Sequence, residues 1–219
     1  MIPLSDADRR PLHFPLATVL IVLINLLVFG LELLGGDAFI TRWSVVPAQI
    51  VAGHGWVTVL TAMFMHAGIV HIAGNMLFLW VFGPEIEDVM GPVRYLLFYL
   101  LGGLVATLAQ SLIAPTSTIP NLGASGAIAA VMGAFLVTYP RDRIRTILVF
   151  GWFARVTFVP AVLLVGMWFL TQVFSQVGAI SQADLGGVAY MAHVGGFLFG
   201  AVFGRLFETR ERRYAEGLD

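Results

Sequence analysis

Six apolar runs follow one another along the chain, and they constrain its fold more than any other feature. They cover approximately residues 14–34, 71–82, 95–114, 125–139, 158–177 and 185–207, and the second ends at Gly83-Pro84-Glu85. A transmembrane α-helix needs about 20 mostly apolar residues, so we add a turn at each end of the second run. Only 11% of the residues are charged, whereas a soluble domain has about a quarter. The sequence therefore predicts an all-α membrane protein, a single bundle of six transmembrane helices.

The arginines indicate how the runs cross the membrane. All twelve basic residues are arginine, and with six spans eleven of them lie on the side that holds both termini; Arg42 is the exception. Positive residues concentrate on the cytoplasmic side of a membrane. We therefore expect a cytoplasmic segment at 1–13, a six-helix domain at 14–207 and a cytoplasmic tail at 208–219, in the cell (inner) membrane.

Two connections between the runs have features of their own. Residues 35–70, on the outer side, contain Trp43 and Trp56 among apolar residues, and tryptophan is favoured at the membrane interface. We expect a partly helical element lying at that interface. Before the fifth run, residues 147–153 are apolar but too short to span the membrane.

The composition argues against several other kinds of site. The chain has no cysteine, which removes disulfides and cysteine-ligated metals. No basic stripe with interleaved aromatic residues suggests a nucleic-acid partner. We expect no cofactor, and we expect the lipid bilayer to surround most of the chain.

A few polar side chains interrupt the apolar runs, and such residues are functional candidates by default. They are Asn25, Glu32, His71, Asn75, Ser125, Gln172 and His193. We interpret Gln172 as an interhelical hydrogen bond and Glu32, near the outer end of its run, as solvated. His71, Asn75, Ser125 and His193 lie roughly 15–24 Å above the cytoplasmic ends of their runs, at a rise of 1.5 Å per residue. Three helices thus bring polar groups to one level, as an enclosed aqueous site requires.

Small residues allow two of these helices to approach each other closely. The fourth and sixth runs each carry a stripe of small residues at spacings of four: Gly126, Ala130 and Ala134, and Ala192, Gly196, Gly200 and Gly204. Such stripes let helix backbones pack tightly in lipid. Because Ser125 and His193 lie one position from these stripes, a tight contact brings the hydroxyl near the imidazole.

The residue types at this level suit nucleophilic catalysis. A serine hydroxyl such as that of Ser125 becomes a nucleophile when a base accepts its proton, and a histidine such as His193 does so at neutral pH. His71 and Asn75, four residues apart on one helix face, are candidate donors to the developing oxyanion, together with backbone N–H groups at residues 123–126. The serine motif is not a hydrolase elbow, which needs glycine where this chain has Ala127.

In these motifs the chain resembles the rhomboid intramembrane serine proteases, over about residues 57–204 and the first run. The matching motifs are His66, His71 and Asn75; Gly123 to Ala127; and Ala192 to Gly196 followed by Gly200. The resemblance implies a catalytic dyad of Ser125 and His193 without a third acid, and an oxyanion hole formed by His71 and Asn75. It also implies a six-helix rhomboid-like bundle whose fifth helix is a lateral gate and whose site opens to the outer side. The activity implied is a serine endopeptidase that cleaves transmembrane segments of membrane proteins near their outer ends, at small or helix-weakening residues.

The chain departs from the family at two positions. Thr58 stands where the arginine of a common Trp-Arg pair is expected, and Ala129 stands where some members have a tyrosine packed on the catalytic histidine. The anchoring of the first loop and the orientation of His193 are therefore open. We interpret His66 as a rim residue that hydrogen-bonds the first loop.

Three other functions compete with this one. A non-catalytic relative would bind membrane segments without cutting them, but such proteins typically lack the serine or the histidine. A zinc site would gather His66, His71 and His193, but no His-Glu-x-x-His is present and no carboxylate shares their level. A channel or transporter leaves the Gly-x-Ser-Gly motif unexplained, and no internal repeat is visible.

Overall fold

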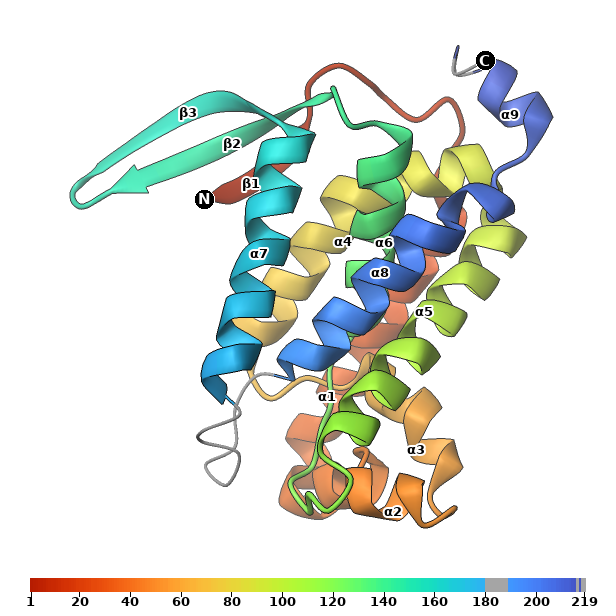
Figure 1. Ribbon diagram of the computed structural model, residues 1–219, viewed down its shortest axis with the longest axis vertical. Coiled ribbons are helices and arrows are strands. Elements are labelled where there is room, and N and C mark those ends of the chain that lie inside the picture. The colour runs from red at the N-terminus through yellow and green to blue at the C-terminus, as the bar shows by residue number, and fades with distance from the viewer. Residues whose placement is uncertain (180–188, 216, 218–219) are drawn as a thin grey trace.

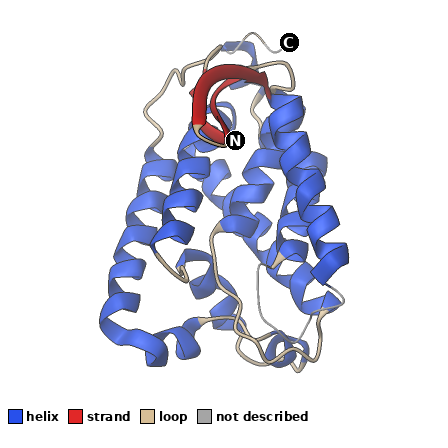
Figure 2. Ribbon diagram, turned by 90° about the vertical axis from the view of Figure 1, so that its left-hand side faces the viewer, coloured by secondary structure: helices blue, strands red, loops and turns tan. Residues whose placement is uncertain are grey.

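The computed structural model describes residues 1–179, 189–215 and 217 as a bundle of helices with a small sheet at one end (Figures 1 and 2). The long helices are α1 (Leu16–Trp43), α4 (Ile69–Met90), α5 (Pro92–Ile113), α6 (Ser125–Thr138), α7 (Ala161–Ala179) and α8 (Tyr190–Phe207). In the described part of the chain, α1, α4, α5 and α8 are long and apolar enough to cross a membrane, whereas α6 and the apolar part of α7 are shorter. The short elements are α2 (Pro47–Val51), α3 (Trp56–Thr61), the 3-10 helix η1 (Ala62–Phe64), α9 (Arg210–Ala215), β1 (Ile2–Asp6), β2 (Arg143–Phe150) and β3 (Phe153–Pro160).

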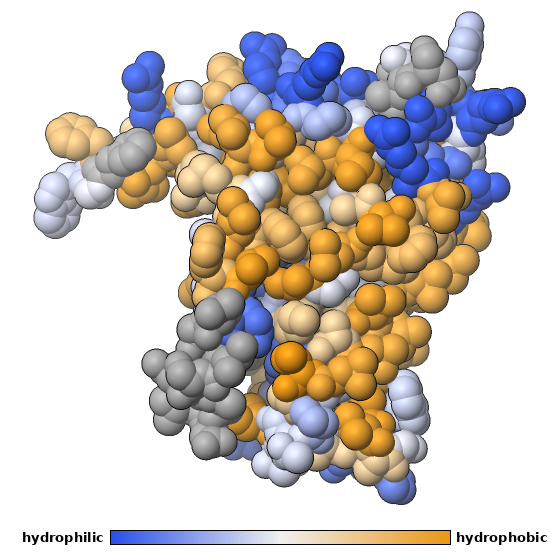
Figure 3. Space-filling view, in the orientation of Figure 1, coloured by the Kyte–Doolittle hydropathy of each residue, from blue (hydrophilic) through white to orange (hydrophobic). Residues whose placement is uncertain are grey.

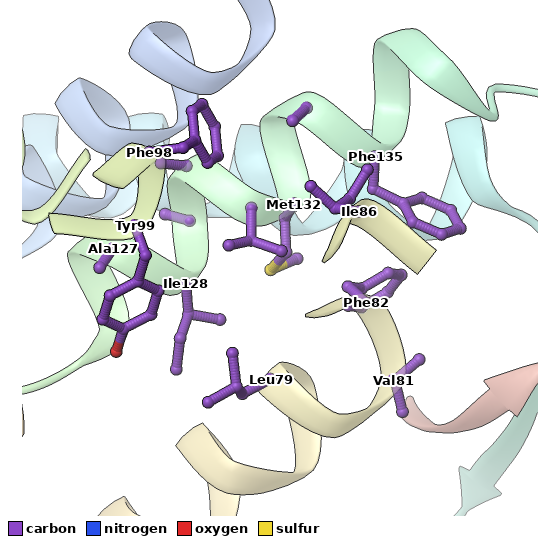
Figure 4. Close-up of a cluster of buried hydrophobic side chains, with 14 of the residues drawn as sticks. Leu79, Val81, Phe82, Ile86, Phe98, Tyr99, Ala127, Ile128, Met132 and Phe135 are labelled. Carbon is purple, nitrogen blue, oxygen red and sulfur yellow. The ribbon is translucent and has the colours of Figure 1, made fainter. Parts of the chain in front are cut away.

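α6 lies in the middle of the bundle, and its side chains are buried from Gly126 to Phe135. α4, α5, α7 and α8 pack around it. The main hydrophobic core lies between α4, α5 and α6, where the rings of Phe82 and Phe135 meet edge to face at 5.0 Å (Figure 4). On the face drawn in Figure 3, apolar side chains form a band between two more hydrophilic ends. Such a large exposed apolar surface is typical of contact with a membrane.

The two stripes of small residues meet as the sequence predicts. A Cβ atom at Gly196 would overlap the carbonyl oxygen of Gly126, and one at Gly200 would overlap the carbonyl oxygen of Ala130. The backbones of α6 and α8 are therefore in direct contact, and only glycine allows this approach.

α4 continues past the point where the sequence predicts its end. It passes through Gly83-Pro84-Glu85 and ends at Met90. Pro84 removes one backbone donor and crowds the preceding turn, but every residue from 81 to 90 is buried, so packing against the bundle outweighs this cost. The extension also places Glu87 at the start of α1, where its carboxylate accepts hydrogen bonds from two N–H groups of the first turn.

The three strands contradict the all-α prediction. β2 and β3 pair as an antiparallel hairpin over their whole length, and β1 pairs antiparallel with β2. The apolar stretch 147–153 lies in this hairpin, which projects sideways from the bundle (Figure 1). Ile144 and Thr146 are buried, while Arg143 and Arg145 are exposed. This alternation has the two-residue period of a strand. It is the sequence signal for β2, and a search for apolar runs does not detect it.

The connection predicted at 35–70 is partly helical, as expected. α1 runs on to Trp43 with a break at Gly36, where φ is 57°, and α2, α3 and η1 follow. These short helices lie at the end of the bundle opposite the sheet and α9 (Figures 1 and 2). Of the predicted sixth span, 185–207, the structure gives α8 from Tyr190 onward; residues 185–188 lie outside the described residues.

Candidate active site

Ser125 is the first residue of α6, and the turn before it depends on a glycine. Gly123 has a φ of 138°, which residues with a side chain rarely adopt. A Cβ atom at this position would lie 3.1 Å from the ring of His71 and 3.5 Å from Oγ of Ser125. The turn therefore holds the serine hydroxyl beside the His71 side chain, at the N-terminal end of the helix.

Ser125 and His193 are in hydrogen-bond contact. Nε2 of His193 lies 2.7 Å from Oγ of Ser125, and the histidine is buried on α8. The backbone contact between α6 and α8 brings the two side chains together, because both lie next to the stripes of small residues. This distance is within the range for a nucleophile and its base.

Gln172 of α7 binds the second nitrogen of His193. Its Oε1 lies 2.7 Å from Nδ1 of the histidine. Its Nε2 lies 3.3 Å from the carbonyl oxygen of Trp168 and 3.1 Å from Oγ1 of Thr171. The interpretation of Gln172 as an interhelical hydrogen bond is confirmed, but spacing alone does not identify its partner as His193. The signal in the sequence that could have pointed to this partner was the place of Gln172 in the carboxyl-terminal half of the run 158–177.

Aromatic rings from two helices enclose His193. The rings of Trp168 on α7 and Tyr190 on α8 have centroids 5.7 and 6.5 Å from the imidazole. Ala129 of α6 is fully buried and presents only a methyl group. Position 129 therefore supplies no ring to His193, and the aromatic contacts of the histidine come from α7 and α8 instead.

His71 and Asn75 carry polar hydrogens that suit the predicted oxyanion hole. The N–H of Ala67 lies 3.3 Å from Nδ1 of His71, so the neutral imidazole has its proton on Nε2, the atom that faces Gly123. Asn75, one turn further along α4, is buried, and its Nδ2 has no hydrogen-bond partner within the described residues. A buried donor without a partner is costly, and a substrate oxygen would satisfy it.

Only part of the segment 123–126 offers backbone donors. The N–H of Gly123 donates to the carbonyl oxygen of Ala62 at 2.9 Å, so it is already engaged. The N–H groups of Ser125 and Gly126 belong to the first turn of α6, which has no intrahelical acceptors. They also lie at the positive end of the helix dipole.

Glu32 and His66 lie beside the site, next to His71. The N–H of His66 donates to both carboxylate oxygens of Glu32, at 3.1 and 3.0 Å. Glu32 is only 3% exposed, so the prediction that it is solvated is wrong: the carboxylate fastens α1 to the segment before α4. The ring of His66 is buried and meets the ring of His71 edge to face at 5.1 Å, so it supports this ring rather than binding the first loop.

A small cavity of about 40 Å³ lies beside Ser125, between α5, α6 and α8. Most of its lining is small or apolar; the lining includes Gly103, Ala106, Gly126, Ala192, Gln110 and Asn121. A water molecule needs about 10–15 Å³ of such space, so the cavity has room for only a small side chain.

The histidines of this region do not form a metal-ligand set. In the described part of the chain, no group of three His, Cys, Asp or Glu side chains is placed to hold a metal ion. His71 and His193 instead direct ring nitrogens to hydrogen-bond partners on neighbouring segments. The zinc alternative therefore finds no support in this geometry.

Most of the chain matches one protein family, because residues 53–210 match the Rhomboid domain. The chain belongs to the rhomboid family. Its apolar helices and this membership make it an integral membrane protein. The resemblance carried by the serine, histidine and asparagine motifs is thereby confirmed at the level of the family.

Several curated rhomboid proteins align with this chain. It is 34% identical over 140 residues to rhomboid protease GluP of Bacillus subtilis, covering 61% of this chain and 27% of that protein. It is 27% identical over 124 residues to the putative rhomboid protease YdcA of the same organism, covering 56% and 62%. It is 28% identical over 188 residues to the mitochondrial Rhomboid protein 1 of Saccharomyces cerevisiae, covering 83% and 50%. The chain thus spans less than two thirds of the length of each.

Proposed function

We propose that this rhomboid is an intramembrane serine endopeptidase that cleaves transmembrane segments of membrane proteins with a dyad of Ser125 and His193. The observation that carries the proposal is the 2.7 Å contact between Oγ of Ser125 and Nε2 of His193. The alignment with proteins named as rhomboid proteases supports the same reaction.

The reaction follows from the hydrogen bonds around the dyad. Nε2 of His193 takes the proton from Oγ of Ser125 as the oxygen attacks the peptide carbonyl. The resulting oxyanion accepts hydrogen bonds from Nε2 of His71, Nδ2 of Asn75 and first-turn N–H groups of α6. The imidazolium then protonates the leaving amine, and a water molecule, activated by His193, hydrolyses the acyl-enzyme.

The membrane arrangement extends the same proposal. We assign six spans, adding α6 and α7 to the four long helices, with residues 1–13 and 208–219 on the cytoplasmic side of the cell membrane. The sheet and α9 lie at one end of the bundle (Figure 1), together with most of the arginines. This distribution supports a cytoplasmic position for that end. Ser125 begins α6 toward the other end, so the site opens to the outer side and substrates are cut near their outer ends.

The cavity beside Ser125 suggests which residues precede the cleaved bond. With a volume of about 40 Å³ and a lining that includes Gly103 and Ala106, it accepts the side chain of alanine, serine or glycine. Larger side chains would displace the walls of a tightly packed interface, which is costly. We therefore assign a small residue to the position on the amino side of the cut.

Reconstituted protein with a reporter transmembrane substrate and a fluorophosphonate probe tests the proposal. Ser125→Ala is expected to abolish both cleavage and labelling, and His193→Ala to reduce both to near background. Ser5→Ala, in β1 at the other end of the bundle, and His54→Ala, in an exposed loop, are matched controls that should keep the wild-type rates. Cleavage that persists in Ser125→Ala would show that Ser125 is not the nucleophile.

Two outcomes would favour the competing functions. Wild-type protein that binds the reporter without cleaving it, and that does not react with the probe, would be a non-catalytic rhomboid. Cleavage that a chelator abolishes and that zinc restores would support the metal-dependent alternative.

A further inference from the structure

The hydrogen bonds of Gln172 determine which nitrogen of His193 carries a proton. A carbonyl oxygen only accepts hydrogen bonds, so the side-chain group that faces the carbonyl of Trp168 at 3.3 Å is the NH2 of the amide. Oε1 of Gln172 therefore faces Nδ1 of His193 at 2.7 Å and accepts its hydrogen. In a neutral imidazole the proton is then on Nδ1, and Nε2 keeps the lone pair that a base needs.

We propose that Gln172 is the positioning residue of the dyad, and that α7 thereby controls whether His193 is oriented to accept the proton of Ser125. This inference rests on the proposed serine protease activity. It assigns to the amide of Gln172 the role that a carboxylate has in a catalytic triad, namely to fix the tautomer and direction of the imidazole. Unlike a carboxylate, the neutral amide adds no charge to a site that lies among apolar side chains.

The other neighbours of His193 do not fix its direction. Trp168 and Tyr190 contact the faces and edges of the ring, and apolar contacts are not directional. Ala129 offers no polar group. Of the hydrogen bonds that the described residues make to the imidazole, one is to the nucleophile and the other is to Gln172, so the orienting bond is the one from α7.

α7 lies at the periphery of the bundle and packs on the other helices through its inner face. Its outer face is exposed and apolar, with Leu163, Met167, Leu170 and Phe174 each about half exposed or more. On its inner face, the ring of Phe169 stacks on Phe197 of α8 at 4.2 Å. A displacement of α7 by about 1 Å would lengthen the bond from Gln172 to His193 beyond hydrogen-bond range. The catalytic histidine is then free to turn away from Ser125.

Variants at position 172 separate positioning from packing. Gln172→Met keeps the length of the side chain but removes the acceptor, and it is expected to lower kcat about 10- to 100-fold, the range for a hydrogen bond to a group that becomes charged. KM should change by less than about twofold, because substrate binding is not involved. Gln172→Glu restores the acceptor for Nδ1 of His193 but loses the NH2 group that faces the carbonyl of Trp168, so it should recover only part of the rate. Gln176→Ala, one turn further along α7, is the matched control.

A spectroscopic signature tests the tautomer directly. With 15N-labelled histidine, wild-type protein should show His193 with its proton on Nδ1, and Gln172→Met should show a mixture of both tautomers. A wild-type kcat in Gln172→Met, or an unchanged tautomer, would overturn the positioning role. If Ser125→Ala abolishes cleavage in the same assay, such a result rejects only this inference and leaves the dyad in place.

A double-mutant cycle tests the connection to α7. Phe169→Ala loosens the contact between α7 and α8, and we expect it to lower kcat through the same hydrogen bond. Combined with Gln172→Met, it should then cause little further loss, since both changes break one interaction. If the fold losses in kcat of the two single variants multiply in the double variant, or if kcat rises in Phe169→Ala alone, α7 does not control His193.

Discussion

Replacing Gly196 by alanine tests whether the contact between α6 and α8 sets the geometry of the dyad. A Cβ atom at Gly196 would overlap the carbonyl oxygen of Gly126 and lie 3.0 Å from its carbonyl carbon. Carbon atoms in contact prefer about 3.5–4.0 Å, so the two backbones must separate by about 1 Å. His193 lies less than one turn before this position, and the separation therefore moves its ring away from α6.

The effect on catalysis follows from this displacement. The present contact between Oγ of Ser125 and Nε2 of His193 is 2.7 Å, and a shift of about 1 Å takes it beyond the range of a hydrogen bond. A misplacement of about 1 Å costs about 100-fold in rate, and we expect this loss in Gly196→Ala. Overpacking should also lower the free energy of unfolding by about 1–3 kcal/mol.

Cleavage of the reporter and labelling by the fluorophosphonate measure the loss, and a thermal melt in the same detergent verifies that the variant is folded. Gly30 of α1 offers a matched control, because a Cβ atom there meets nothing within 4 Å. Gly30→Ala should therefore keep the wild-type rate. Folded Gly196→Ala protein with wild-type cleavage would refute the reasoning, since the dyad would then tolerate a wider spacing of its helices.

Three other changes test separate parts of the structure. Gly123→Ala places a Cβ atom 3.1 Å from the ring of His71 at a residue whose φ is 138°. It should therefore slow cleavage strongly, while the melting temperature falls only slightly. Glu87→Ala leaves N–H groups at the start of α1 without their acceptor; it should lower the free energy of unfolding by about 1–3 kcal/mol while the folded fraction keeps its specific activity. The side-chain hydrogen bond from Arg143 lowers the pKa of the Asp8 carboxyl below its ordinary value of 3.8, so this pair stabilises the protein above that pH and is lost as the pH falls through the lowered pKa. The protection factors of the β1 amides against hydrogen exchange should therefore fall on acidification below about pH 4, and fall less in Asp8→Asn, whose pair is already broken at neutral pH.

The sequence predicts best those elements whose signal is local. The runs at 95–114 and 125–139 correspond closely to α5 (Pro92–Ile113) and α6 (Ser125–Thr138), because an apolar stretch in lipid must satisfy its own backbone as a helix. The contact between Ser125 and His193 could also be predicted, since small residues at spacings of four mark where two helices meet.

Predictions failed where packing against distant residues decides the outcome. The sequence at Gly83-Pro84-Glu85 is a helix stop in isolation, but α4 continues because its last turns are buried against the bundle. The strands at 143–160 were not predicted, because the apolar stretch 147–153 was recognised only as too short to span the membrane and no secondary structure was assigned to it. Glu32 was expected in solvent because its partner, the N–H of His66, lies in another part of the chain.

The sequence by itself determined the membrane class, most of the helices, and the level at which His71, Asn75, Ser125 and His193 gather. Only the tertiary structure decided what orients His193. A hydrogen bond depends on the direction and identity of two atoms from separate elements, and no periodicity in the sequence records that relation. In the sequence, Gln172 is therefore only one more polar residue in an apolar run. Its role becomes visible when α7 packs beside α8, which places Oε1 of Gln172 2.7 Å from Nδ1 of His193.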